Sequence, residues 1–322
     1  MAPYDGSVMD AALELTEVVK EFGGFRAVNG LSFSVRKGEI FGFLGPNGAG
    51  KTTTLRMILD IIAPTSGAIS VLGAPSSRPQ RARIGYLPEE RGLYRKMRAA
   101  ESIAYFARLR GAPAADAKRR AYELLDQFGL GEFARSRNEA LSKGMAQKVQ
   151  LLATIAHDPE LLILDEPFSG LDPINQGALE DLIRSLKASG KTIIFSTHVM
   201  EHAERLCDRF MIIAKGEKRF EGTLEEARAD QPQRITLRTP AAAADLAGID
   251  AVAQVAPLGD PAEGAAMNGH AAMDYQIDLK DGADPDAFLA ACVAAGVAVR
   301  RFDASSASLH DIFVSLAGEE GQ

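Results

Sequence analysis

A glycine-rich loop with the sequence GPNGAGKTTT, at residues 45–54, constrains the fold of this chain more than any other feature. It follows the apolar stretch EIFGFL and precedes apolar residues at helical spacing, so it joins a strand to a helix. Gly45, four further residues, Gly50, Lys51 and Thr52 form the pattern of a phosphate-binding loop. Glycines there let backbone N–H groups point at phosphate oxygens, and the start of the helix adds partial positive charge. This segment, which we call the phosphate loop, predicts a nucleotide-binding α/β fold.

Two side chains of the phosphate loop have expected roles of their own. Lys51 supplies a full positive charge to the β- and γ-phosphates, which also makes it a candidate catalytic residue, and the Thr52 hydroxyl is an expected ligand of Mg²⁺. The whole loop is expected to contact the nucleotide, through Gly45, Pro46, Asn47, Gly48, Ala49, Gly50, Lys51, Thr52 and Thr53.

The chain up to Gly222 alternates predicted strands with predicted helices, which indicates a doubly wound, largely parallel sheet. Residues 13–35 contain two bursts of alternating apolar and polar residues, typical of strands with one buried face. Residues 97–140 are helical in pattern and separate two α/β halves. The run LLILDEP, from residue 161, is typical of a parallel strand covered on both faces.

Composition and charge change after Gly222. The remaining residues contain 16 Asp and Glu against 6 Lys and Arg, which gives them a formal net charge of −10. Because the whole chain has a formal net charge of −7, residues 1–222 carry about +3. A body this weakly basic argues against a nucleic-acid partner. The tail predicts the element order βαββαβα, which is compatible with a small ferredoxin-like module. No apolar run reaches the roughly 18 residues of a membrane span, so we expect membrane contact through a partner.

Acidic and imidazole side chains follow two of the predicted strands. Asp165 and Glu166 end LLILDEP at the carboxyl edge of the sheet, where ligands of open α/β sheets bind. We expect Asp165 to hold Mg²⁺ through water and Glu166 to polarise the attacking water. His198 closes the strand IIFSTH and is expected to contact the γ-phosphate. Asp172, in SGLDP, is a predicted helix N-cap and a candidate nucleotide contact as well.

Together with LSKGMAQKVQ at residues 141–150, these motifs resemble the nucleotide-binding subunits of ABC transporters over residues 13–222. LSKGM is similar to the family's signature, whose usual form is LSGGQ. Ser142 and Gly144 match it, whereas Lys143 and Met145 replace a glycine and a glutamine. A serine and a glycine at a helix start form an anion site, and in the family this site binds the γ-phosphate of the nucleotide held by the opposite subunit.

The resemblance implies an α/β fold: a P-loop NTPase of the ABC ATPase type, with an antiparallel β subdomain and a helical insertion. The ABC ATPase domain would span residues 10–222, with the insertion at about residues 97–140, and a small α+β accessory domain would span residues 223–322. The implied cofactors are ATP and Mg²⁺, with Thr52, Glu89 and Asp165 as metal ligands.

Two further sites are implied by the same resemblance. Phe22, in KEFGG, corresponds to the family's aromatic residue that stacks on adenine, with Phe25 as the substitute. Glu89, in PEERGLY, stands where a glutamine usually links Mg²⁺ and the attacking water to the permease, and Glu90 is the alternative residue.

The expected function is ATP binding and hydrolysis that drive export through a separate membrane permease, as in exporters of the sodium and drug-efflux kind. The expected partners are that permease and a second ATPase subunit, expected to be an identical copy, and the expected location is the cytoplasmic face of the membrane. One alternative is a soluble ABC-type ATPase that acts as a mechanical clamp in translation or DNA repair. Another is a module that holds ATP without hydrolysing it.

Overall fold

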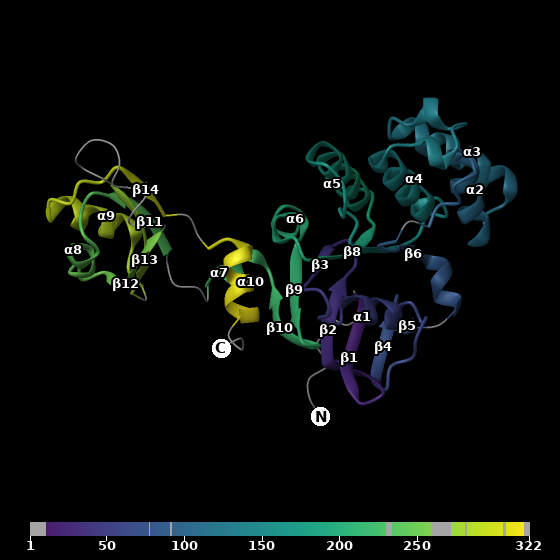
Figure 1. Cartoon of the computed structure of the whole chain (residues 1–322). Helices are drawn as coiled ribbons and strands as arrows, with labels where there is room; N and C mark the ends of the chain where they lie inside the picture. The colour runs from purple at the N-terminus through teal and green to yellow at the C-terminus, as the bar shows by residue number, and fades with distance from the viewer. Residues whose placement is uncertain are drawn as a thin grey trace. The chain divides into compact units, whose positions relative to one another are not determined.

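The computed structural model describes residues 11–76, 78–90, 92–229, 234–258, 272–280, 282–304 and 307–318. The chain divides between Thr223 and Leu224 into two compact units (Figure 1). The first unit holds the phosphate loop and every candidate site residue named above.

A six-stranded sheet forms the centre of the first unit, in the order β10-β9-β3-β8-β7-β6. The five strands from β9 to β6 are mutually parallel, and β10 pairs with β9 in the antiparallel direction. The strands are β3 (Ile40–Leu44), β6 (Ile84–Leu87), β7 (Leu161–Asp165), β8 (Thr192–Thr197), β9 (Arg209–Ala214) and β10 (Glu217–Gly222). Every residue of β3, β7 and β8 is buried, and the burial of β7 confirms the prediction made from LLILDEP.

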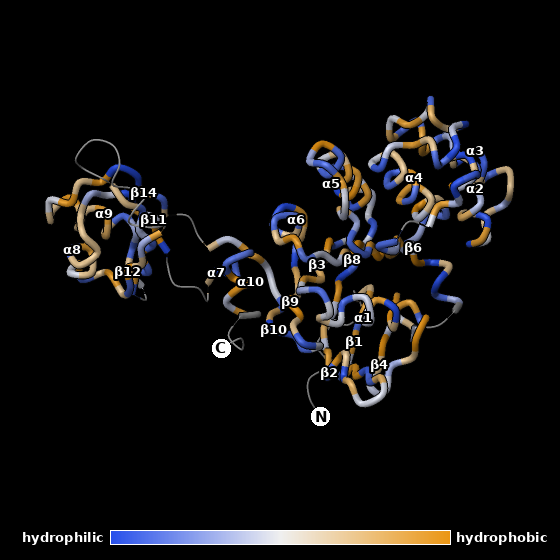
Figure 2. Tube along the Cα trace, in the orientation of Figure 1, coloured by the Kyte–Doolittle hydropathy of each residue, from blue (hydrophilic) through white to orange (hydrophobic). Residues whose placement is uncertain are grey.

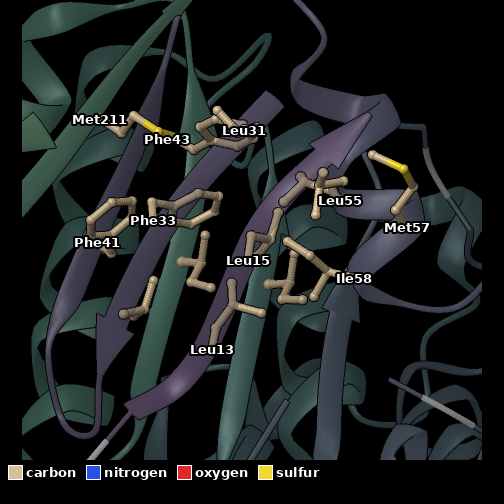
Figure 3. Close-up of a cluster of buried hydrophobic side chains, with 14 of the residues drawn as sticks. Leu13, Leu15, Leu31, Phe33, Phe41, Phe43, Leu55, Met57, Ile58 and Met211 are labelled. Carbon is tan, nitrogen blue, oxygen red and sulfur yellow. The ribbon is translucent and has the colours of Figure 1, made fainter. Parts of the chain in front are cut away.

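A second, antiparallel sheet has the strand order β2-β1-β4-β5. Its strands are β1 (Ala11–Phe22), β2 (Phe25–Arg36), β4 (Ser66–Val71) and β5 (Ala74–Pro75). Helix α1 (Lys51–Ile58) shares one hydrophobic core with this sheet and β3 (Figure 3). In that core the rings of Phe33 and Phe41 stack with centroids 5.6 Å apart. The start of α1, which carries the phosphate loop, is thereby fixed by packing on both sheets.

The described residues of the first unit also form six α-helices and short 3₁₀ segments. Helix α5 (Pro173–Ala188) mixes hydrophobic and hydrophilic residues along its length in Figure 2, and it buries Leu179, Leu182, Ile183 and Leu186 on one face. The others are α1, α2 (Ala99–Leu109), α3 (Ala114–Gln127), α4 (Lys143–Ile155) and α6 (Met200–Leu206), with 3₁₀ segments at Arg78–Arg83, Gly131–Phe133 and Asn138–Ala140. Helices α2 and α3 lie within residues 97–140, the expected helical insertion, and both contact each other and α4.

The second unit contains an antiparallel sheet in the order β12-β13-β11-β14. Its elements are α7 (Leu224–Ala229), β11 (Arg234–Thr239), α8 (Ala243–Ala247), β12 (Val252–Leu258), β13 (Met273–Leu279), α9 (Pro285–Ala294), β14 (Arg301–Asp303) and α10 (Leu309–Gly318). From β11 onward this is the βαββαβα order that the sequence predicted, and α7 is an addition that it did not predict. In the described part of the chain, no helix is long and apolar enough to cross a membrane.

Three elements of the first unit differ from the sequence prediction. Strands β1 and β2 are longer than the two apolar bursts, because β-bulges shift their register between Leu15 and Lys20 and interrupt the alternation. Helix α1 ends at Ile58, so Leu59 and Ile62, which belong to the apolar residues at helical spacing after the phosphate loop, follow the helix. Strand β6 was not predicted, and it completes the edge of the central sheet next to β7.

Candidate nucleotide-binding site

Four neighbouring parallel strands deliver the predicted site residues to one edge of the central sheet. The phosphate loop follows β3, His198 follows β8, Glu166 follows β7 and Glu89 follows β6. Parallel strands end at the same edge, so segments far apart in sequence meet there. The adjacency of β3, β8, β7 and β6 therefore builds the site.

The phosphate loop turns into α1 through Gly50, which has a φ of 104°. This left-handed conformation is strained for any residue with a side chain. A Cβ on Gly50 would also lie 2.6 Å from the backbone oxygen of Ala27. The loop backbone can therefore approach β2 and open its N–H groups toward the cavity only with glycine at this position.

Lys51 lies within the loop rather than pointing into solvent. Its Nζ donates to the carbonyl oxygens of Gly45 at 2.6 Å and Pro46 at 3.1 Å, and it lies 3.7 Å from Glu166 Oε1. Burial lowers the pKa of the Lys51 ammonium, while the carboxylates of Glu166 and Asp165 oppose this shift. A phosphate would therefore meet a poorly solvated cation that is already held in position.

Asp165 and Glu166 are both buried at the end of β7, with exposed fractions of 2% and 8%. The Ser196 hydroxyl on β8 donates to Asp165 Oδ1 at 2.5 Å and accepts the backbone N–H of Glu166 at 3.1 Å. Glu166 has a φ of 47°, which is unusual for a residue with a side chain. Its Oε1 lies 3.0 Å from His198 Nδ1. The Glu166 carboxylate is thus oriented by His198 on one side and by Lys51 on the other.

The aromatic residues Phe22 and Phe25 face each other across the turn between β1 and β2. Both rings are accessible, with exposed fractions of 47% and 66%, and Lys20 Nζ lies 4.9 Å from the centre of the Phe22 ring. A cavity of about 310 Å³ extends from these rings along the phosphate loop to Glu89 and Glu166. It is lined by Phe22, Phe25, Ala27, Pro46, Asn47, Gly48, Ala49, Gly50, Lys51, Thr52, Thr53, Glu89 and Glu166. An aromatic platform at one end and a phosphate loop at the other suit a nucleotide in this cavity.

Oxygen donors at the carboxyl end of the sheet fit a magnesium ion. Thr52 and Glu89 line the cavity, whereas Asp165 is the residue before the lining residue Glu166 and does not line the cavity itself. Among the residues that the structure describes, no group of three or more His, Cys, Asp or Glu could hold a metal without other ligands. Mg²⁺ keeps several waters and is commonly held by one or two protein oxygens together with phosphates. The donors therefore fit a metal that arrives with a nucleotide.

Glu90, the alternative to Glu89, does not line this cavity. Its backbone carbonyl accepts a hydrogen bond from Gln150 Nε2 at 3.3 Å. Of the two acidic residues, the structure therefore brings only Glu89 to the phosphate loop.

Ser142, Gly144 and Asp172 lie at two helix starts and are absent from the lining of the cavity. Ser142 caps α4 by accepting the Met145 N–H, and Asp172 caps α5 by accepting the Asn175 N–H at 3.0 Å. Gly144, on α4, packs closely on α5, since a Cβ at Gly144 would lie 2.3 Å from the side chain of Asn175. The N-cap role predicted for Asp172 is confirmed.

Ser196 is a site residue that the sequence analysis did not single out. It bonds to both acidic residues at the end of β7, yet within the buried strand TIIFST it is one of several small polar residues. The sequence did hold one indication of its role: a serine in a strand predicted to be buried must find a hydrogen-bond partner for its hydroxyl.

Comparisons with known proteins show which family this chain is similar to. A family model described as ABC transporter matches residues 28–169. The uncharacterized ABC transporter ATP-binding protein YhaQ of Bacillus subtilis is 38% identical over 95% of this chain and 98% of its own length. Nod factor export ATP-binding protein I of Paraburkholderia xenovorans is also 38% identical, over 97% of this chain and 99% of its own length. A solved structure of an ATP binding subunit of an ABC transporter has a TM-score of 0.62 and 35% identity, over 68% of this chain and 92% of that one.

Proposed function

Because this chain belongs to the ABC transporter family, as an ATP-binding subunit, we propose that it hydrolyses MgATP to drive export through a membrane permease on a separate polypeptide. The observation that carries the hydrolysis is the contact of Glu166 with His198 and Lys51 at the end of the phosphate loop. A buried carboxylate held between an imidazole and an ammonium at this place is suited to orient a water for attack on a phosphate.

Each polar group of the site has a role in this proposal. Lys51 binds the terminal phosphates, and Thr52, Glu89 and Asp165 hold Mg²⁺, which would neutralise charge on the phosphate oxygens. Glu166 accepts a proton from the water, and His198 fixes the Glu166 carboxylate and reaches the γ-phosphate. Phe22 stacks on the adenine ring, and Phe25 is its substitute.

A second subunit is part of the proposal because the site of one chain lacks its signature residues. Ser142 and Gly144 lie outside the cavity that holds the phosphate loop, so we assign them, with Asp172, to the nucleotide of an opposing identical copy. ATP would then close two subunits around two shared nucleotides, and hydrolysis would reopen them. The export direction is supported by the relative that is named for Nod factor export.

The permease is the partner that would bring this chain to the cytoplasmic face of the membrane. We assign its contact to the helical insertion and to the loop that carries Glu89, because this loop lines the cavity and contacts α4, which packs on α2 and α3 of the insertion. Co-purification of the chain from membranes with a polytopic protein tests this assignment. A partner that is a ribosomal particle or DNA instead would favour the clamp alternative.

Hydrolysis is tested by phosphate release from purified chain, with Glu166→Gln and Lys51→Ala as variants. We expect Glu166→Gln to lose nearly all turnover while ATP still holds the chain as a dimer. Lys51→Ala is expected to lose both ATP binding and turnover. Turnover of Glu166→Gln at the wild-type rate would refute the role of Glu166. ATP binding by the wild type without phosphate release would support a module that holds ATP unchanged.

A further inference from the structure

Residues 167–172, which follow Glu166 and lead into α5, make buried contacts that the proposed mechanism does not use. Pro167 and Phe168 are buried. The side-chain amide of Gln147, on α4, donates to the carbonyl oxygen of Pro167 at 3.0 Å. The bond joins two elements 20 residues apart in sequence, and Gln147 is itself only 9% exposed.

This bond lies one residue from a strained position. Glu166 has a φ of 47°, and residues in this region persist only where their surroundings hold them. On the strand side, Glu166 is held through its N–H by Ser196. On the loop side, its own carbonyl accepts the Ser169 N–H at 3.1 Å, and the next carbonyl belongs to Pro167. Gln147 therefore anchors the far end of the turn that aims the Glu166 carboxylate.

Helix α4 also contacts the other end of the same segment. The absence of a side chain at Gly144 lets α4 approach Asn175, whose side chain donates to the Asp172 carboxylate at 2.7 Å. Two residues of α4 thus make contacts, Gln147 with Pro167 in the turn and Gly144 with Asn175 beyond it. The position of the helix and the backbone position of Glu166 are mechanically linked within one chain.

We propose that Gln147 is a positioning residue for Glu166, which acts through its amide bond to the Pro167 carbonyl. The inference rests on the proposed hydrolysis, in which Glu166 orients the water. Without the bond, the turn at Glu166 and Pro167 relaxes, and the carboxylate loses its alignment while the phosphate loop and its nucleotide contacts stay intact. The expected defect is therefore in kcat and not in ATP affinity.

The main test is steady-state ATP hydrolysis by Gln147→Met, which keeps an unbranched side chain of similar length and removes the donor. We expect kcat per ATP-binding chain to fall about 10- to 100-fold, as small misplacements of catalytic groups do, with KM for ATP unchanged. The matched control is Thr154→Val on the same helix. Thr154 is likewise 9% exposed, and the substitution removes a hydroxyl that donates to the Gln150 carbonyl. Wild-type kcat in Gln147→Met, or an equal loss in Thr154→Val, would overturn the proposal.

Gln147→Glu keeps the test decisive if Gln147→Met does not fold. A carboxylate cannot donate to the Pro167 carbonyl, but a protonated carboxyl can. The ratio of Gln147→Glu kcat to wild-type kcat should therefore rise as the pH falls, whereas a ratio independent of pH would contradict the proposal. The proposed function is tested separately, by whether the wild type hydrolyses ATP and whether Lys51→Ala abolishes that turnover. A failure of the Gln147 variants to behave as expected would therefore refute the role of Gln147 without refuting hydrolysis.

Discussion

Replacing Ser196 by alanine removes a hydrogen-bond donor to the buried Asp165 carboxylate of the site. The Ser196 hydroxyl donates to Asp165 Oδ1 at 2.5 Å, and Asp165 is 2% exposed, which leaves little access for water to replace the lost donor. The Glu166 N–H also loses an acceptor, but it keeps the Ser196 backbone oxygen at 3.2 Å. The cost of Ser196→Ala therefore comes mainly from Asp165.

The expected magnitude follows from the charge of the acceptor. Hydrogen bonds to charged groups contribute about 1.5–3 kcal/mol to stability, against about 0.5–1.5 kcal/mol for neutral pairs. In a unit of this size each kcal/mol lowers Tm by about 2–4 °C, so Ser196→Ala should lower the Tm of the first unit by about 3–12 °C. Because the two units can unfold separately, the transition of the first unit is identified by its shift with ATP.

Ser102→Ala is the matched control for this experiment. Ser102 is fully buried and accepts from Asn138 Nδ2 at 2.7 Å, a neutral partner that also donates to the Tyr94 carbonyl. Its loss should cost less and leave ATP hydrolysis unchanged, whereas Ser196→Ala should also slow hydrolysis. Differential scanning calorimetry and phosphate release measure both effects. A Tm shift for Ser196→Ala no larger than that for Ser102→Ala would refute the reasoning.

Three further predictions test other parts of the first unit. Phe22→Ala should raise the Kd for ATP at least about fivefold, from the loss of stacking; a larger effect of Phe25→Ala in the same titration would assign the platform to Phe25 instead. Gly144→Ala should place a methyl group against Asn175 and weaken ATP-dependent dimerisation without weakening ATP binding, as measured by size-exclusion chromatography and equilibrium binding; unaltered dimerisation would count against the assignment of α4. Burial, with a smaller contribution from Arg110, lowers the pKa of His157 from 6.5 to about 4. The unfolded chain then binds a proton that the folded chain does not, so stability should fall as the pH falls from about 6.5 to about 4, by at most about 1.4 kcal/mol per pH unit. His157→Leu should flatten this part of the curve of Tm against pH, and an unchanged slope would contradict the prediction.

Strand β7 was predictable because its run LLIL is apolar, short and closed by acidic residues. The apolar runs in β3 and β8 were recognisable in the same way, because such runs are typical of strands buried on both faces. Their order in the sheet was not predictable. It brings His198 and Glu166 together from β8 and β7, and only the pairing of the strands shows it.

Elements that depend on local irregularity escaped the sequence analysis. The alternation in β1 breaks at bulges near Glu17, where φ is 49°, so the true strand length was hidden. Strand β6 has four residues, too few for a periodic signal, and its strand form depends on pairing with β7. Ser196 was overlooked for a related reason, because its partners lie about 30 residues away in the chain.

The hold of Lys51 on its own loop has a consequence for how a nucleotide would enter. The ammonium donates to the carbonyl oxygens of Gly45 and Pro46, so the loop's own backbone oxygens hold the cation in the place where it would meet a phosphate. When a nucleotide binds, its phosphate oxygens would replace these carbonyl oxygens around the Lys51 ammonium. The ammonium would stay in place, and little of the loop backbone would need to become ordered. Association should accordingly cost little conformational entropy, and most of the affinity should appear in slow departure rather than in fast arrival.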